Sequence, residues 1–465
     1  MVARVVCAGV LASLVLPAQI PDLRPPTPLF GAVLSNDTQS VKQLLAAGAD
    51  PNEQRFVGSQ AILFAVVNGN LEMTRALLER GADAKTTDMH GSTTLMWAAG
   101  ADTPNVALVD ALLKQGVDPN ARNQMGETAL TWASRRGNVS MVERLKAAGA
   151  RDTEAVRRSV ESAVAVLQKS GPQFVKVSGC VSCHHQSLPQ MMYGAARERG
   201  LHVDEAISQQ QVKAVMAMFK PLRQQMAEGT IALPNPAITV SYSLLGLAAE
   251  GYAANDVTDA MIAAIARTQR ADGSFTIIPF RPPLEASQFT AAALSIRAMQ
   301  IFGRDSGERI AKAGEWLRQA APATQEDRSM KLLGLAWLKA DDKDIERAAG
   351  ELLAQQRADG GWAQLPGLES DAYATGQALV ALYEARVLQP EDRAFQHAVT
   401  YLLRTQMPDG SWMVRTRASP VQVFKDSGFP HGRDQWISAA GTSWAAMALA
   451  LTQPKEPGVM VSGVF

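Results

Sequence analysis

The sequence carries no net charge, because its 45 lysines and arginines balance its 45 aspartates and glutamates. It also lacks any long run of basic residues. Phosphate binding requires clustered lysine and arginine, so this absence argues against nucleic acid as the main partner. It argues equally against a polybasic anchor on a membrane surface. With 465 residues, of which 47% are hydrophobic, the chain is predicted to form two or three domains with sizeable cores.

Long apolar runs are absent as well. The apolar stretch at residues 5–16 is too short to span a bilayer. It follows the basic Arg4 and precedes Ala18, a small residue suited to cleavage, as in a secretory signal. We therefore predict a signal peptide over residues 1–18, a periplasmic or secreted bacterial protein, and no integral membrane segment after cleavage. A buried first helix is the alternative.

Cysteine is scarce: the chain has Cys7, inside the predicted signal, and then only Cys180 and Cys183. Together with His184, the last two form the Cys-x-x-Cys-His pattern that attaches a c-type haem. Each thiol binds one vinyl group of the porphyrin, and the histidine ligates the iron. We therefore predict covalent haem c on Cys180, Cys183 and His184. Three alternatives stay open: a Cys180–Cys183 disulfide or redox dithiol, a structural metal site that adds His185, and coincidence.

The iron ligand opposite His184 is not identified by the motif. The adjacent His185 cannot reach the opposite face of the same iron. Residues 420–436 form a long, aromatic insertion that is predicted to fold over the site as a lid. An open sixth position favours small-ligand chemistry, and a filled one favours electron transfer. The candidate sixth ligands are Met191, Met192, His202 and His431.

Residues 27–150 repeat with a period near 33, with copies that open at residues 27, 60, 93 and 128. The first copy reads Thr-Pro-Leu-Phe-Gly-Ala. This pattern resembles the ankyrin repeat, although no copy keeps the histidine of the family signature. The resemblance implies stacked helix pairs that bind a protein partner, with a spacer role as the alternative. Each copy closes on a glycine expected in the left-handed conformation: Gly48, Gly81, Gly116 and Gly149.

Residues 153–452 place alanine and leucine at the three-to-four spacing of helices, and residues 453–465 form a tail. A second repeat runs through this part: glutamine, two residues, Asp-Gly, then a small residue and an aromatic one, starting at Gln269, Gln356 and Gln406. It resembles the repeat of squalene-hopene cyclases and prenyltransferases. The resemblance implies an (α/α)6 toroid in which these glutamines and aromatic residues are structural. The predicted fold is therefore all-α, an ankyrin solenoid followed by a toroid.

The toroid predicts six inner helices, and residues 180–184 lie just before the first of them. The haem is therefore expected at one mouth of the ring, where the loops before the inner helices converge. Mostly small or hydroxyl residues mark the predicted starts of these helices, which are Ser187, Thr239, Ser287, Ser329, Asp371 and Gly441.

The sequence argues against the alkene-protonating chemistry of the cyclases. Class II cyclases of the family protonate an alkene with the middle aspartate of a DxDD motif. Only its first aspartate, Asp371, is in register here, and Tyr373 and Ala374 occupy the later positions. Asp371 stays a catalytic candidate, with a helix N-cap as the alternative. The zinc site of protein prenyltransferases is not expected, because both remaining thiols belong to the haem motif.

These features together predict an exported haem c protein with a redox or haem-sensing role, docked to a protein partner by its ankyrin repeats. One alternative is an enzyme that acts on an apolar, isoprenoid-like substrate in the toroid cavity. The other is a non-catalytic interaction scaffold with a Cys180–Cys183 disulfide.

Overall fold

The computed structural model describes residues 27–55, 59–136, 138–151, 153–279, 281–419, 423–456 and 464. The chain divides into two compact units, Met1–Asp152 and Thr153–Phe465. The predicted signal peptide over residues 1–18, with Cys7, lies outside the described residues. Within the described ranges, no helix combines the length and the apolar character that crossing a membrane requires.

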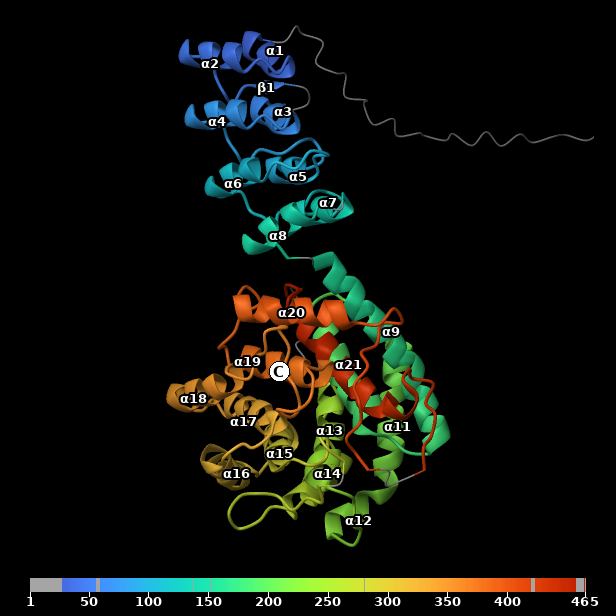
Figure 1. Ribbon diagram of the computed structural model, residues 1–465. Coiled ribbons are helices and arrows are strands. Elements are labelled where there is room, and N and C mark those ends of the chain that lie inside the picture. Colours follow the sequence, from blue (N-terminus) through green and yellow to red (C-terminus); the bar gives the residue numbers. More distant parts are fainter. Residues whose placement is uncertain are drawn as a thin grey trace, which may run out of the picture. The chain divides into compact units, whose positions relative to one another are not determined.

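The first unit contains four helix pairs that follow the period found in the sequence (Figure 1). The described residues are predominantly helical, as the predicted all-α class requires, and one short antiparallel pair of strands, β1 (Gln54–Arg55) and β2 (Ser59–Gln60), lies between the first two helix pairs. The pairs are α1 (Pro28–Leu34) and α2 (Thr38–Ala46), α3 (Ala61–Val67) and α4 (Leu71–Glu79), α5 (Thr94–Ala99) and α6 (Val106–Lys114), and α7 (Ala129–Arg135) and α8 (Val139–Ala147).

Local signals explain where the second helix of each pair begins and ends. A side-chain oxygen caps each start by accepting a bond from a free backbone N–H of the first turn. These caps are Asp37, Asn70, Asn105 and Asn138. The glycines after the helices have positive φ angles, so the predicted left-handed conformation is confirmed. The angles are 93° at Gly48, 87° at Gly81, 73° at Gly116 and 85° at Gly149.

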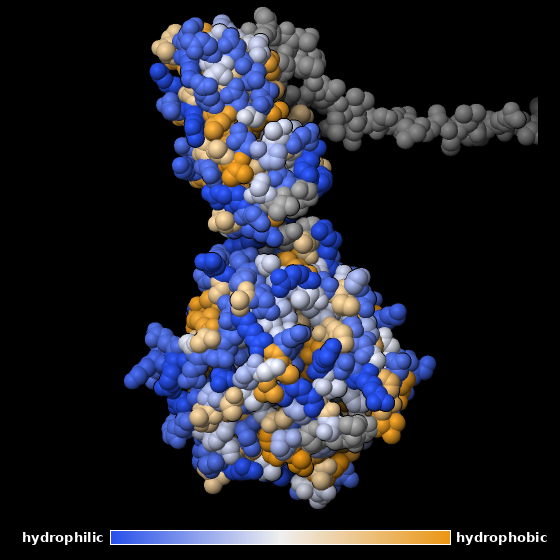
Figure 2. Space-filling model, viewed as in Figure 1, coloured by the Kyte–Doolittle hydropathy of each residue, from blue (hydrophilic) through white to orange (hydrophobic). Residues whose placement is uncertain are grey.

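The second unit is built around six largely buried helices. Each contacts the next in chain order, and the last contacts the first, so the six close a ring. On the face that Figure 2 shows, hydrophobic residues lie in small groups between hydrophilic ones. The ring helices are α10 (Leu188–Arg197), α13 (Pro236–Ala249), α15 (Gln288–Phe302), α17 (Gln325–Trp337), α19 (Ala372–Glu384) and α21 (Gln435–Ala450).

The other helices of this unit cover the ring or connect its members (Figure 1). Helices α9, α14, α16, α18 and α20 each contact at least one ring helix. They are α9 (Thr153–Ser178), α11 (Glu205–Phe219), α12 (Arg223–Glu228), α14 (Asp256–Ala266), α16 (Gly307–Gln319), α18 (Asp342–Leu353) and α20 (Arg393–Thr405). Three short turns of helix, η1 (Cys183–Ser187), η2 (Lys220–Leu222) and η3 (Gly432–Asp434), complete the unit.

Three of the six predicted starts of the ring helices agree with the structure. Helices α10, α15 and α19 begin directly after Ser187, Ser287 and Asp371, as predicted, and the last two residues also cap their helices with a side-chain oxygen. The other three helices begin earlier than expected. Pro236 starts α13, where its fixed φ suits the first helical position. A capping box of Thr324 with Asp327 starts α17, and α21 starts at Gln435.

The repeated glutamines join successive outer helices. Each side-chain amide donates to a backbone oxygen of the next outer helix in order. The last of these bonds joins the end of α20 to α9, the first outer helix of the unit. Their role here is structural, as the resemblance implied. The bonds run from Gln269 to Arg309 (2.8 Å), from Gln356 to Ala394 (2.8 Å) and from Gln406 to Ser159 (2.9 Å).

The described part of the predicted tail packs against the helical unit. Val464 is fully buried, and its carbonyl accepts a bond from Arg297 Nε at 2.9 Å. The backbone N–H of Glu456 donates to the carbonyl of Glu198 at 2.9 Å. These contacts make residues 456 and 464 part of the helical unit.

Candidate functional site

The cysteine motif lies on the short connection between α9 and α10. Helix α9 ends at Ser178, and Gly179 then adopts a φ of 70°, which allows the chain to turn. The π-helix η1 starts at Cys183 and contacts α9, α10, α13 and α21. Cys180 is exposed, whereas Cys183 is buried. One thiol therefore faces solvent while the other faces the interior, close to the start of the first ring helix.

A cavity of about 240 Å³ opens beside the motif. Cys180, Cys183 and His184 all line it. Other lining residues come from α9, α11, α13 and the segments before α13 and α15, among them Met218 and Glu285. The structure thus brings the three residues of the predicted haem site to one hollow.

Charged groups at this cavity act on the Cys183 thiol. Burial raises the pKa of Cys183 well above its ordinary value, and the Glu285 carboxylate raises it further, while Arg281 lowers it. Arg281 pairs with Glu285 at 3.4 Å. Burial also raises the pKa of Glu285, against the opposing effects of Arg281 and Asn235. Cys183 is therefore a neutral thiol at neutral pH, not a thiolate nucleophile.

Two buried imidazoles meet behind the cavity. His184 is 7% exposed and His185 is 0% exposed, and a hydrogen bond joins their Nδ1 atoms. The His184 ring stacks on Trp436, with centroids 5.5 Å apart, and the His185 ring stacks on Phe174 at 4.7 Å. Burial lowers the pKa of His184 well below its usual range, with further lowering from His185 and Arg281. Burial lowers the pKa of His185 to about 3.

The predicted lid contacts both histidines where the structure describes it. His185 Nε2 bonds to Ser427 Oγ at 2.8 Å, and Trp436 covers His184. Phe424, 46% exposed, stacks in turn on Trp436 at 6.4 Å. Residues 420–422 of the segment lie outside the described part.

None of the four predicted sixth ligands is among the residues that line the cavity. Met191 and Met192 are fully buried within α10, and His202 is exposed. His431 bonds to Ser411 Oγ through its Nε2 at 2.7 Å. Met218, at the end of α11, does line the cavity, and sequence reasoning missed it because no motif marks it.

Two alternatives to haem are not seen in the structure. Cys180 and Cys183 are both free thiols, so the structure does not contain the disulfide of the alternative reading. Across the described ranges, no group of three or more histidine, cysteine, aspartate or glutamate side chains is arranged to hold a metal ion. The proposed structural metal site of His184, His185 and the two thiols therefore has no support.

Asp371 acts as the N-cap of α19. Its carboxylate accepts a bond from the backbone N–H of Ala374 at 2.9 Å and another from Gln364 Nε2 at 3.1 Å. Burial raises the pKa of Asp371 to about 6, against the lowering effect of these bonds. The geometry is that of the capping alternative.

Sequence reasoning also missed Glu326, a buried acid on α17. Its carboxylate accepts bonds from Thr290 Oγ1 at 2.6 Å and from Gln377 Nε2 at 3.0 Å. Burial raises its pKa to about 7, although Thr290, Gln377 and Tyr373 act to lower it. The hydroxyl of Tyr242 is also buried, and it has no hydrogen-bond partner among the described residues. An acid in the first turn of a helix normally indicates a surface residue that complements the dipole, so the sequence held no sign of burial.

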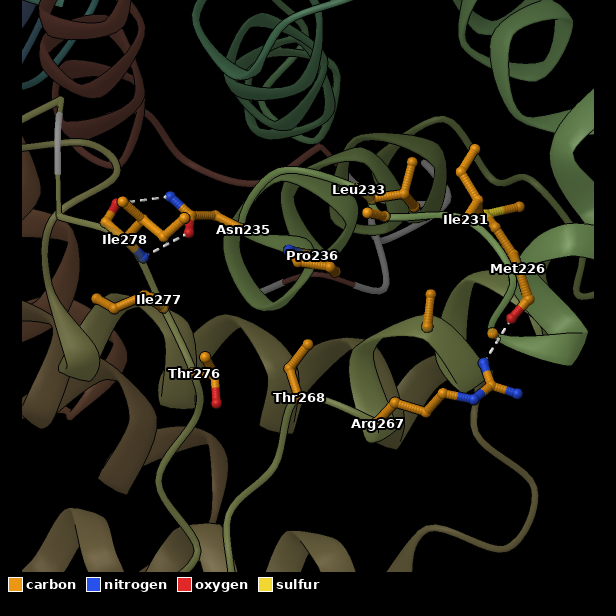
Figure 3. Close-up of a pocket in the computed structure, with 13 residues that line it drawn as sticks. Met226, Ile231, Leu233, Asn235, Pro236, Arg267, Thr268, Thr276, Ile277 and Ile278 are labelled. Atoms are coloured by element: carbon orange, nitrogen blue, oxygen red, sulfur yellow. Dashed lines mark hydrogen bonds between the residues drawn. The ribbon is translucent and has the colours of Figure 1, made fainter.

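A second hollow, of about 310 Å³, is lined by residues of the segment that leads into α13, among them Leu233 and Asn235 (Figure 3). Asn235 supports this segment by exchanging two bonds with the backbone of Ile278, at 2.9 and 2.7 Å. Arg267 donates to the carbonyl of Met226 at 2.5 Å on the far rim. Leu233 lines both hollows, so this segment forms a shared wall.

Comparison with known proteins concerns the first unit. A family model described as ankyrin repeats, with three copies, matches residues 29–123. The B-cell lymphoma 3 protein homolog of Mus musculus is 39% identical over 72 residues, which is 16% of this chain and 16% of that protein. The chain thus aligns with about one sixth of the length of this relative. Residues 29–123 are ankyrin repeats, and the fourth helix pair, α7 and α8, continues the same architecture.

Proposed function

We propose that this protein is an exported c-type haem protein that docks to a protein partner through its ankyrin repeats. The observation that carries the proposal is that Cys180, Cys183 and His184 line one cavity, with both thiols free. Ankyrin repeats are interaction modules that present an extended concave surface. The haem would serve electron transfer or haem-linked sensing, in the periplasm or outside the cell.

The donor set fits a covalently held haem. Cys180 and Cys183 would hold it by two thioethers, and His184 would be its axial ligand. Of the cavity-lining residues outside the motif, Met218 carries the thioether type of ligand used by cytochromes c. A bound haem would supply one-electron redox chemistry or, with an open position, small-ligand binding.

The cavity volume limits how the group is held. At about 240 Å³ the cavity is smaller than the ~300–1,000 Å³ typical of pockets for drug-sized ligands. A haem held by Cys180, Cys183 and His184 would therefore be only partly enclosed by the lining residues. Partial exposure of this kind suits electron exchange with a docked partner better than catalysis in a closed site.

The fold of the second unit is proposed to be the (α/α)6 toroid of the cyclase and prenyltransferase type. The ring of six helices supports this, as do the glutamine bonds between successive outer helices. In such a fold the haem motif lies at one mouth of the ring, before the first inner helix.

The test is expression with c-type haem maturation machinery, followed by acid-acetone extraction. We expect the wild-type protein to keep its Soret absorbance and its haem mass after extraction. The double variant Cys180→Ala/Cys183→Ala should lose both completely. Val181→Ala, which changes only a spacer position of the motif, is the matched control and should keep them. A folded wild-type protein without extraction-resistant haem would leave the interaction scaffold as its function.

A second candidate function, proton transfer to an apolar isoprenoid-like substrate within the ring, is favoured by Glu326. A buried carboxylic acid with a pKa of about 7 is suited to general acid catalysis. Close packing argues against it: a Cβ added at Gly376 would lie 2.4 Å from the backbone of Trp444, so α19 and α21 leave no room there. If this function exists, Glu326→Gln abolishes conversion of a polyisoprene substrate in a product assay by mass spectrometry. No turnover by the wild-type protein would reject it.

A further inference from the structure

We infer that His185 is a positioning residue that fixes the tautomer of His184, with the proton on Nδ1 and the lone pair on Nε2. His184 is thereby held ready to ligate a metal through Nε2. The inference rests on the proposed haem function and adds a residue to it that the motif does not include. Two hydrogen-bond chains end at His184, and the direction of the first fixes the position of its ring proton.

The first chain starts at Gln435. Its Nε2 donates to the carbonyl of Lys425 at 3.2 Å, so its Oε1 faces Ser427. That oxygen accepts from the backbone N–H of Ser427 at 2.8 Å and from the Ser427 hydroxyl. A flipped amide would set its NH₂ group against the N–H of Ser427, which excludes the other orientation.

The Ser427 hydroxyl has one proton, and Gln435 Oε1 receives it. Ser427 Oγ can therefore only accept at its contact with His185 Nε2, 2.8 Å away, so His185 carries its proton on Nε2. A neutral imidazole carries one ring proton, which leaves His185 Nδ1 as an acceptor. The bond between the two Nδ1 atoms then requires that His184 be the donor.

The second chain starts at Gln186 and is independent of the first. Its Nε2 donates to the carbonyl of Gly171 at 2.9 Å, so its Oε1 faces Ser182. That oxygen accepts from the backbone N–H of Ser182 at 2.8 Å and from the Ser182 hydroxyl at 3.2 Å. When the Ser182 hydroxyl donates to Gln186, its Oγ can accept the Nδ1–H of His184, at 3.2 Å. The first chain requires a proton on Nδ1 of His184, and the second can accept that proton, which leaves the lone pair on Nε2.

This arrangement has a consequence for a bound iron. A ligating histidine usually donates its other ring N–H to an acceptor, which fixes the tautomer, orients the ring and makes the ligand more basic. Here the acceptor is the imidazole nitrogen of His185. A more basic axial ligand stabilises the oxidised iron, so His185 is expected to lower the reduction potential.

The first measurement needs no haem. Long-range ¹⁵N–¹H correlation spectra of the haem-free protein report which ring nitrogen of each histidine is protonated. We expect Nδ1–H on His184 and Nε2–H on His185. In Ser427→Ala the His185 Nε2–H loses its acceptor, and the fixed assignment should give way to exchange between tautomers. A wild-type spectrum with the His184 proton on Nε2 overturns the inference, whether or not the protein binds haem.

The second measurement is the reduction potential of the haem-loaded protein. In His185→Phe the ring that stacks on Phe174 is kept, but the acceptor nitrogen is lost. Covalent haem should be retained. Replacing a residue that hydrogen-bonds to a metal ligand typically changes the properties of the metal site about tenfold or more. A tenfold change in the equilibrium between the oxidised and reduced iron corresponds to about 59 mV. We therefore expect the reduction potential of His185→Phe to be higher than that of the wild type by about 59 mV or more. The control is His90→Phe, on an exposed residue of the other unit, which should leave the potential unchanged.

The outcomes separate the two ideas. Absence of covalent haem from the wild-type protein rejects the proposed function but leaves the tautomer measurement valid. Covalent haem with equal potentials in wild type and His185→Phe rejects the role of His185 alone. Should His185→Phe not fold, Ser427→Ala keeps both histidines, and its potential must then rise if the chain acts on the iron.

Discussion

Replacing Gly410 by alanine is expected to lower the free energy of unfolding of the helical unit by about 3 kcal/mol. Gly410 has a φ of 88°, and an added Cβ would lie 2.5 Å from the carbonyl oxygen of Ser162. The left-handed conformation costs a residue with a Cβ about 1–2 kcal/mol, and overpacking against a backbone adds about 1–3 kcal/mol. The turn cannot move aside easily, because Gln406 bonds it to α9.

Urea unfolding of the full chain, followed by tryptophan fluorescence, measures the loss. Gly350→Ala is the matched control, because Gly350 lies inside α18 with nothing within 4 Å of an added Cβ. That substitution should raise stability by about 0.5–1 kcal/mol, as alanine does in a helix interior. If the two substitutions changed the free energy of unfolding equally, the turn at Gly410 would not lie as close to α9 as the structure places it.

The free energy of unfolding of the wild-type protein is expected to fall by about 3 kcal/mol as Glu326 titrates, and replacing Glu326 by glutamine should remove this fall. The pKa of Glu326 is about 7 in the folded protein and near 4.5 when the chain is unfolded. Between these values the folded state keeps a proton that the unfolded state has lost. Stability therefore falls as pH rises from about 4.5 to about 7, the opposite of an acid stabilised in its charged form.

The measurement compares urea unfolding at pH 4.5 and pH 8. Other carboxyls titrate in both proteins, so the difference between their pH dependences isolates Glu326. We expect the wild-type protein to lose about 3 kcal/mol more than Glu326→Gln between the two pH values. Glu351→Gln, at an exposed position on α18, should behave like wild type. Identical pH dependences in wild type and Glu326→Gln would mean that this carboxyl is not desolvated.

The sequence alone was sufficient for features that a few neighbouring residues control. The left-handed glycines, the helix starts at Ser287 and Asp371, and the ankyrin period were read correctly, because capping and backbone sterics act within one turn. The start of α17 was misplaced for a similarly local reason. The hydroxyl at Ser329 looked like a cap, while the reciprocal bonds of Thr324 and Asp327 mark the true start.

Several residues of the candidate site could be identified only from the tertiary structure. The motif in the sequence identified Cys180, Cys183 and His184, but nothing in it marked Met218 or the acceptor role of His185. Those depend on α11 reaching the cavity and on Ser427, 242 residues away in the chain, meeting the imidazole. The burial of Glu326 likewise arises only when α15, α17 and α19 lie together. Hydrogen-bond direction and desolvation are set by such distant neighbours, and one sequence does not show which residues will be neighbours.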